Sequence, residues 1–281
     1  MSASFSPPHR AESVPGGYRF TGRGKLASTV RDSPWVMMTG IVFDGEQPRA
    51  TPFGPMIVAL ALRTSDVEIV DTWHSLGMRG TDSNDVAAEG VFVPEALSFV
   101  VAPVYEPGPQ FTGPLYRLPA LASVDVIIAP VALAIARGAI AALRELADRK
   151  MPIGSMKTIR HRPAVQSALA DAEAQLRASR LLFYETLNTT WQRAIKNESA
   201  TLEQRADLML ACAHAVQTSA HVADLMHRMG GTSGIYEGSR LERHFRDAQT
   251  VRHHGFLSES RLETVGQVYL GLEPEFGFVA F

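Results

Sequence analysis

The chain has 281 residues, of which 46% are hydrophobic and 20% are charged, a composition typical of a globular protein with one large or two smaller domains. Its 27 Lys and Arg nearly balance its 29 Asp and Glu, so the formal net charge is -2. This balance argues against nucleic acid or a charged membrane surface as a partner.

The only cysteine, Cys212, lies in the apolar run LMLACAHAV and is expected to be a small buried hydrophobe. One cysteine allows no disulfide within the chain, which favours a reducing, cytoplasmic location. The N-terminus is polar and contains proline, unlike the apolar core of a signal peptide. The longest apolar stretch, residues 126–136, is too short to span a bilayer, which takes about 20 residues.

Residues 1–17 are predicted to be disordered, and residues 18–104 to form a β domain. Short strand-like segments separated by Gly, Pro, Asp and Ser recur in the second range. These segments are GYRFTGRG, PWVMMTGIVF, GPMIVALALR, DVEIVDTW and DVAAEGVFVP. Strands of this length and spacing predict a small antiparallel barrel or sandwich.

Residues 105–118 are predicted to be a linker, because the prolines of YEPGPQFTGPLYRLP interrupt regular backbone hydrogen bonding. Helical patterns fill residues 119–281. They cover 120–149, 162–187, 202–229, 239–251 and 257–272, and Pro130 marks a kink or an offset start in the first. The fold class is therefore α+β, with the β domain followed by an antiparallel four-helix-bundle domain.

The sequence contains no Walker loop, and its GGTSG segment follows a helix rather than a strand, so a Rossmann fingerprint is absent. Any nucleotide cofactor must be held in another way. His214, His221 and His227 recur on one predicted helix without an i, i+4 histidine pair and a nearby carboxylate, so no metal site is predicted.

Two extended motifs carry a family resemblance. Residues 73–95, WHSLGMRGTDSNDVAAEGVFVPE, and residues 229–254, MGGTSGIYEGSRLERHFRDAQTVRHH, together resemble the acyl-CoA dehydrogenase superfamily. The chain most resembles the oxygenase components of flavin-dependent two-component monooxygenases, such as 4-hydroxyphenylacetate hydroxylase and dibenzothiophene monooxygenase. The resemblance implies FAD or FMN between the β domain and the bundle, reduced flavin from a separate flavin reductase, homotetramers, and a small aromatic or sulfur-containing substrate.

The resemblance also implies a large helical domain before the segment GYRFTGRGKLAS, and only 17 residues precede Tyr18 here. We therefore expect either a separate chain that supplies this domain or a truncated, non-catalytic homologue that acts as an assembly subunit. A further alternative is a desaturase of the acyl-CoA dehydrogenase type.

The adjacent histidines near the C-terminus are the candidate proton-transfer groups. In common acyl-CoA dehydrogenases a glutamate after the Arg-Asp pair removes the substrate proton, and counting from Arg246-Asp247 places Gly255 there. Monooxygenases have a Gln-His pair in this stretch, which implies His254 as the catalytic base and His253 as an orienting residue. A histidine with a pKa of about 6.5 can accept a phenol or thiol proton at neutral pH. Judged from the residues alone, both could cap helix carbonyls.

Ser28 matches a family serine that lies near flavin N5 and helps to hold the oxygen adduct. The resemblance likewise places Trp35, Thr81 and Ser83 beside the flavin, and Arg79 beside the flavin or the substrate. The plain alternatives are a strand-end hydroxyl, a core aromatic ring and ordinary turn residues.

The segment Gly230, Gly231, Thr232 and Ser233 offers backbone N–H groups and hydroxyls to a flavin phosphate or ribityl chain, often across a subunit boundary in the family. A plain helix C-cap is the alternative. Arg246 and Asp247 are expected to brace their helix, with Glu242 paired to Arg246.

Overall fold

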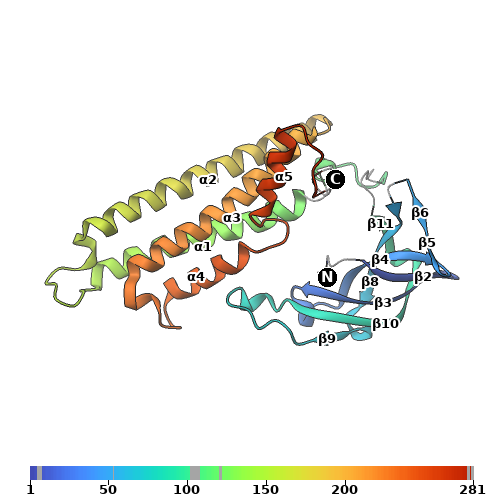
Figure 1. Ribbon diagram of the computed structural model, residues 1–281, viewed down its shortest axis with the longest axis horizontal. Coiled ribbons are helices and arrows are strands. Elements are labelled where there is room, and N and C mark those ends of the chain that lie inside the picture. The colour runs from blue at the N-terminus through green and yellow to red at the C-terminus, as the bar shows by residue number, and fades with distance from the viewer. Residues whose placement is uncertain (5–7, 53, 102–107, 120–121, 277–278, 280–281) are drawn as a thin grey trace. The chain divides into compact units, whose positions relative to one another are not determined.

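The computed structural model describes residues 1–4, 8–52, 54–101, 108–119, 122–276 and 279. The chain divides into two compact units, each drawn in Figure 1. A β unit contains Met1–Ser75 and Arg79–Val104, and a helical unit contains Leu76–Met78 and Tyr105–Phe281. The predicted linker lies partly outside the described residues, and its described part contains a short 3-10 helix, Pro114–Arg117.

A mixed sheet forms the β unit, in the strand order β11-β8-β4-β2-β3-β10-β9, with β1 and β5 also paired to β4. The strands are β1 (Ser2–Ala3), β2 (His9–Val14), β3 (Gly17–Ala27), β4 (Trp35–Asp44), β5 (Gln47–Pro48), β8 (Ile57–Arg63), β9 (Glu68–Val70), β10 (Asn84–Pro94) and β11 (Ser98–Val101). A separate ribbon joins β6 (Ala50–Thr51) and β7 (Gly54–Pro55).

Alternation of buried and partly exposed residues explains the central strands. Along β4, Val36, Met38 and Val42 are buried while their neighbours are not, as expected for a strand with one face in the core. The same core contains Phe20 of β3 and Leu60 of β8. The predicted strands are therefore confirmed.

The prediction of disorder in residues 1–17 is wrong for the described part of that range. β2 lies between β4 and β3, and it pairs with β4 in parallel, as β1 does. The sheet is therefore mixed and not purely antiparallel. In the segment HRAESV only Ala11 is buried, so its polar residues provided no signal for a strand. Backbone pairing on both sides holds this strand.

The helical unit contains α1 (Ala122–Arg149), α2 (Pro163–Lys196), α3 (Leu202–Gly230), α4 (Arg240–Val251) and α5 (Ser260–Tyr269). These confirm the five predicted helices. α3 contacts each of the other four, and α1 also packs along α4 (Figure 1). Many of the buried residues of α3 are alanine, which permits close approach of several helices. Thr201 and Gln204 begin this helix with a capping box.

α1 extends beyond the apolar stretch of residues 126–136 at both ends. Val124–Arg149 is long and apolar enough, with a mean hydropathy of 2.2 over its most apolar 18-residue window, to cross a membrane by length and composition alone. The apolar stretch 126–136 by itself remains shorter than the roughly 20 residues of a bilayer span, and only the whole helix reaches that length. Its apolar side chains Ala132, Ala136, Ile140 and Leu143 belong to the bundle core, which accounts for the composition.

A buried carboxyl group lies near the start of α1. Asp125 is 5% exposed, and its Oδ1 has no hydrogen-bond partner among the described residues. Burial raises the pKa of Asp125 to about 7, and the positive charge of Arg261 offsets this only in part. The neighbouring Cys212 is fully buried as predicted, and burial also raises the pKa of its thiol.

We predict that Asp125→Asn stabilises the helical unit at pH 8 and changes little near pH 4. The unfolded carboxyl group ionises at its ordinary pKa of 3.8, whereas the folded one retains its proton up to about 7. Wild-type stability must therefore fall as pH rises through this window, by at most about 4 kcal/mol. Denaturant unfolding at several pH values measures the difference.

The matched control is Asp148→Asn, which removes an exposed carboxylate paired with Arg160 near the other end of α1. It should show no comparable gain at pH 8. An equal gain from both substitutions would contradict the burial argument.

Candidate functional site

Three residues predicted to face a flavin meet in the β unit. Ser28 Oγ lies 2.8 Å from Ser83 Oγ, which lies 2.7 Å from Thr81 Oγ1. The cause is the antiparallel pairing of β3 and β10, in which Ala27 faces Asn84. Ser28 and Ser83 therefore lie next to each other, one residue beyond the last pair of the two strands. Ser28 is exposed, whereas Ser83 is buried, so the chain of hydroxyls runs inward from an accessible group.

The backbone around these hydroxyls is strained. Five non-glycine residues among those described have positive φ, and three of them flank the hydroxyl chain: Leu26 at 58°, Thr29 at 58° and Asp82 at 46°. Such conformations cost on the order of 1–3 kcal/mol each and persist mainly where function requires them. Leu26 is also 60% exposed. Strain and an exposed apolar side chain together mark this corner as a candidate ligand contact.

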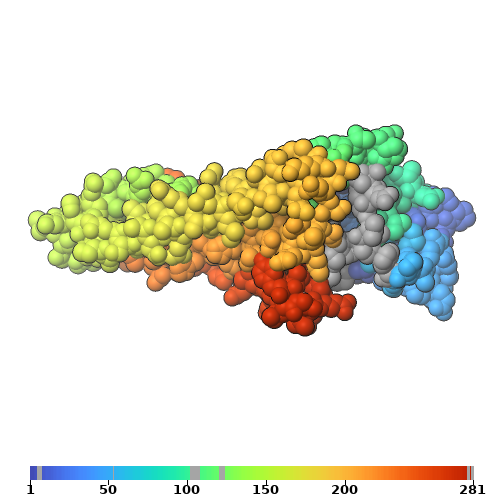
Figure 2. Space-filling view, turned by 90° about the horizontal axis from the view of Figure 1, so that it is seen from above, coloured from blue at the N-terminus to red at the C-terminus, as the bar shows by residue number. Residues whose placement is uncertain are grey.

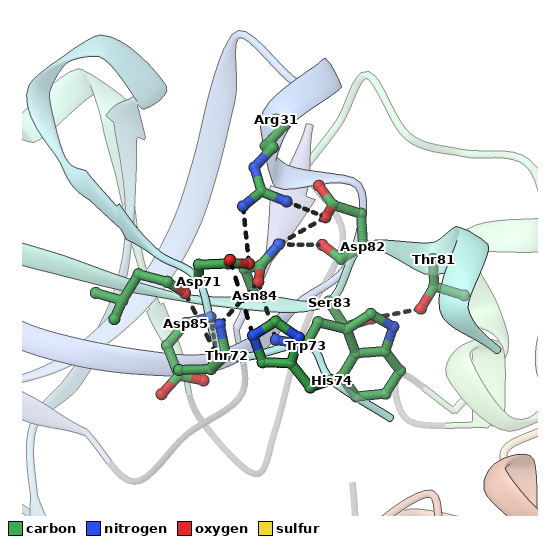
Figure 3. A network of polar contacts seen from close by, with 11 residues as sticks. Arg31, Asp71, Thr72, Trp73, His74, Thr81, Asp82, Ser83, Asn84 and Asp85 are labelled. Atoms are coloured by element: carbon green, nitrogen blue, oxygen red, sulfur yellow. Dashed lines mark hydrogen bonds and ion pairs between the residues drawn. The ribbon is translucent and has the colours of Figure 1, made fainter. Parts of the chain in front are cut away.

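A polar network holds the strained turn before β10 (Figure 3). Fully buried Asn84 donates to Asp82 Oδ1 at 2.6 Å and accepts the backbone N–H groups of Thr72 and Trp73, both at 3.0 Å. Arg31 bridges Asp82 and Asp71. The loop after β9 and the turn before β10 are therefore fixed to each other through one buried amide.

Trp35 and Arg79 make contacts of their own. Trp35 begins β4, its neighbour Val36 pairs with Ser2 of β1, and the guanidinium of Arg63 lies 4.9 Å from the centroid of the Trp35 ring. Arg79 is exposed, and its Nε donates to Ser75 O at 3.0 Å. The roles predicted for these two residues stay predictions.

The histidine pair follows the end of α4 in the helical unit. His253 is exposed, while His254 is half-buried, and burial lowers the pKa of His254. His254 Nδ1 accepts the Phe256 N–H at 3.4 Å, a long and weak hydrogen bond. In the neutral ring this leaves the hydrogen on Nε2. His254 is thus uncharged at neutral pH, which a base requires.

The glycines of the 230–233 segment have structural roles. A Cβ at Gly230 would lie 2.5 Å from the Leu241 side chain, and Gly231 has a φ of 52° at the end of α3. Lys150, which sequence reasoning missed, donates to Gly230 O at 2.5 Å. The glycines therefore allow tight packing, and Thr232 and Ser233 are the groups left for a ligand.

A cavity of about 420 Å³ lies beside this segment. Its polar lining includes Ser233, Ser239, Arg149 and Arg240, and Arg240 is paired with Glu145 at 3.0 Å. No sequence motif pointed to Arg149 or Arg240. The cavity lies at the start of α4 and His254 follows its end, so a helix of 12 residues, about 18 Å long, separates the two sites.

A short segment of the loop between β9 and β10 is bound to α4. Asp247 Oδ1 accepts the Met78 N–H at 2.6 Å, and Arg246 Nη1 donates to Leu76 O at 2.8 Å. The predicted pair of Arg246 with Glu242 is also present. The Arg-Asp pair therefore braces the helix and in addition binds residues 76–78.

No group of three His, Cys, Asp or Glu side chains in the described ranges could hold a metal ion. His227 instead stacks on Phe245, with 4.6 Å between ring centroids, and contacts Gly234 O at 3.1 Å.

Known proteins share both the sequence and the fold. Residues 126–259 match the family described as "Acyl-CoA dehydrogenase, C-terminal domain". The indole-3-acetate monooxygenase of Pseudomonas putida is 31% identical over 279 residues, which cover 99% of this chain and 69% of that protein. The chain belongs to the flavin-dependent monooxygenases of the acyl-CoA dehydrogenase superfamily. The predicted resemblance is confirmed.

Other members of this monooxygenase family extend the comparison. The FADH2-dependent resorcinol hydroxylase, oxygenase component, of Rhizobium sp. is 27% identical, with 98% of this chain and 69% of that protein covered. XiaF from Streptomyces sp., solved with FADH2 and glycerol, has a TM-score of 0.87 at 23% identity, covering 98% of this chain and 69% of that one. The structural likeness shows that the fold is shared.

We predict that Gly77→Ala releases residues 76–78 from α4. A Cβ at Gly77 would lie 2.2 Å from Arg246 O, and a backbone atom cannot rotate away. Overpacking of this kind costs about 1–3 kcal/mol. Hydrogen exchange of the Met78 amide, which donates to Asp247, should accelerate.

Gly80→Ala is the control, because a Cβ at Gly80 meets nothing within 4 Å. Unchanged exchange at Met78 in the Gly77 variant would contradict this account of the binding.

Proposed function

We propose that this chain is the oxygenase component of a two-component monooxygenase. It would take reduced FAD or FMN from a separate reductase and use O₂ to oxygenate a small aromatic or sulfur-containing substrate. The observation that carries this proposal is the neutral, half-buried His254, followed by Gly255 where a dehydrogenase would need a carboxylate. The relatives' names, indole-3-acetate monooxygenase and resorcinol hydroxylase, support the substrate class. The free, buried Cys212 supports a cytoplasmic location.

The described residues fit a flavin at two places. In the β unit, exposed Ser28 on a strained backbone offers a hydroxyl to the polar edge of the ring, and Thr81, Ser83 and Trp35 belong to the same proposed site. In the helical unit, the cavity beside Ser233 offers Arg149 and the first N–H groups of α4 to a phosphate. Gly230, Gly231 and Thr232 directly precede Ser233, which lines that cavity. Arg149 is the cationic group that would attract a flavin phosphate here, since Arg240 is paired with Glu145 of the same cavity.

The proposed chemistry assigns a proton-transfer step to His254. When bound and reduced, the flavin supplies the electrons that activate O₂. The lone pair of His254 Nδ1 would face the substrate once its weak contact with the Phe256 N–H is given up, and it would take the proton of the substrate hydroxyl or thiol group, leaving a substrate anion and a cationic ring that keeps its hydrogen on Nε2. His253 would orient this ring, and Arg79 would contact the substrate. A hydroxyl or thiol group that loses its proton becomes more electron-rich and thus easier to oxygenate.

We further propose a homotetramer in which the phosphate cavity serves the flavin of another subunit. The length of α4 between this cavity and His254 favours such sharing. Apolar side chains on the outer face of α2, including Leu181, Tyr184 and Ile195, are exposed in the single chain, and Figure 2 shows α2 along the viewed face. Such a face is typical of an oligomer interface. Sedimentation equilibrium measures the assembly.

The proposal predicts tighter binding of reduced than of oxidised flavin, with no reduction of bound flavin by acyl-CoAs. Acyl-CoAs are not expected to reduce the flavin, because Gly255 cannot remove the substrate proton that desaturation requires. Anaerobic titration of the chain with flavin and then with a panel of acyl-CoAs, followed by absorbance, tests both. Rapid bleaching by any acyl-CoA would favour the desaturase instead.

We predict that His254→Ala lowers oxygenation by roughly 10²- to 10⁴-fold, the usual effect of removing a positioned proton-transfer group. Flavin affinity should change little. Because burial lowers the pKa of His254, the wild-type rate should hold down to pH 6.5 and fall below it as the ring becomes protonated. The variant should lack this acid limb.

His253→Ala is the matched control, since His253 is the exposed neighbour. Equal losses from the two substitutions, or an unchanged pH profile in His254→Ala, would argue against the assignment of the base.

A further inference from the structure

The direction of the hydroxyl chain decides what Ser28 can do. Each serine or threonine hydroxyl carries one hydrogen but can accept as well. In the Ser28–Ser83 contact and in the Ser83–Thr81 contact, either oxygen could be the donor. If Ser28 donates to Ser83, its only hydrogen is used and it can merely accept from a ligand. If Ser83 donates to Ser28, the hydrogen of Ser28 remains available.

The surroundings fix the oxygen positions and leave this direction as the variable. Ser83 is 5% exposed, so water has little access to its hydroxyl. The backbone of Ser28 is held by Ser2 Oγ, which donates to Ser28 O at 2.7 Å. The turn of Thr81 is held by the Thr29 N–H, which donates to Thr81 O at 2.7 Å. Both ends of the hydroxyl chain are therefore anchored through their backbones, independently of the hydroxyls.

We propose that Ser83 is a positioning residue that makes Ser28 a hydrogen-bond donor to the bound flavin. Thr81 donates to Ser83, Ser83 donates to Ser28, and Ser28 directs its hydrogen outward from the β unit. Ser83 acts only through Ser28 and does not touch the cofactor. The inference rests on the proposed flavin site and changes the role predicted for Thr81 and Ser83, from cofactor contacts to supports of one contact.

The strain near Ser28 fits this arrangement. Leu26 and Thr29 adopt left-handed conformations on either side of Ala27 and Ser28, an unfavourable geometry for a branched side chain such as Thr29. The turn presents the Ser28 hydroxyl at the surface while keeping it within 2.8 Å of Ser83. A group that only closed the end of a strand would not require two such residues.

A double-mutant cycle on reduced-flavin binding tests the proposal. Ser28→Ala, Ser83→Ala and the double variant would be titrated anaerobically with reduced FMN and reduced FAD, and Kd measured by absorbance or anisotropy. Loss of one hydrogen bond should weaken binding about 3- to 10-fold in each single variant. In the Ser28→Ala background, Ser83→Ala should add almost nothing, because its effect passes through a hydroxyl already removed.

Three further variants separate direction from stability. Ser2→Ala removes a buried hydrogen bond to Ser28 O but leaves the hydroxyl chain intact, so it should lower the thermal midpoint without changing Kd. Ser83→Thr retains a hydroxyl and should restore most of the affinity. Thr81→Val keeps the side-chain shape and should weaken binding less than Ser83→Ala. The thermal midpoint of each variant shows whether it is folded.

The outcomes distinguish the inference from the proposed function. Additive losses in the double variant would overturn the inference alone, since Ser83 would then act on the flavin without Ser28. A loss of affinity in Ser2→Ala equal to that in Ser83→Ala would also overturn it, in favour of a structural role. Failure of the wild-type chain to bind either reduced flavin would overturn the proposed function, and the inference with it.

Discussion

The pairing of β3 with β10 is the constraint on which the β-unit site depends. With Ala27 opposite Asn84, the residues just beyond the pairing, Ser28 and Ser83, must lie within hydrogen-bond distance. The same register brings buried Asn84 to the point where its side chain can hold both the Asp82 turn and the loop after β9. A shift of one strand by one residue would turn its side chains to the opposite face of the sheet and separate these groups.

Close packing around α3 has the corresponding role in the helical unit. Small side chains allow α3 to contact all four other helices, so α4 is fixed along its length and His254 is held half-buried just beyond its end. Burial keeps that ring uncharged, so the packing also sets its chemistry. Within the same unit, Arg246 and Asp247 of α4 also bind the backbone of residues 76–78.

Packing requirements and ligand requirements can be separated within one motif. In the 230–233 segment, Gly230 is required by the Leu241 side chain and Gly231 by its positive φ, whereas Ser233 lines a cavity with Arg149 and Arg240. A glycine-rich motif at a helix end is thus mostly a packing device here. Of the two arginines beside it, Arg149 comes from α1 and is distant in sequence, whereas Arg240 begins α4 close to Ser233 and is paired with Glu145.

The sequence by itself determined the helices, most of the strands and the family, because apolar periodicity and two long motifs are local signals. It also pointed to Ser28, Ser83 and His254 as candidates, and their roles stay predictions. It could not identify β2, whose polar residues resemble a disordered segment, or the mixed sheet that results from its insertion between β3 and β4. Nor could it show that Gly77 packs against the backbone of Arg246 while Gly80 has open space around it, or that Asp125 is buried. Those features depend on contacts between residues far apart in the chain, and only the tertiary structure decides which backbone segments pair and which side chains are buried.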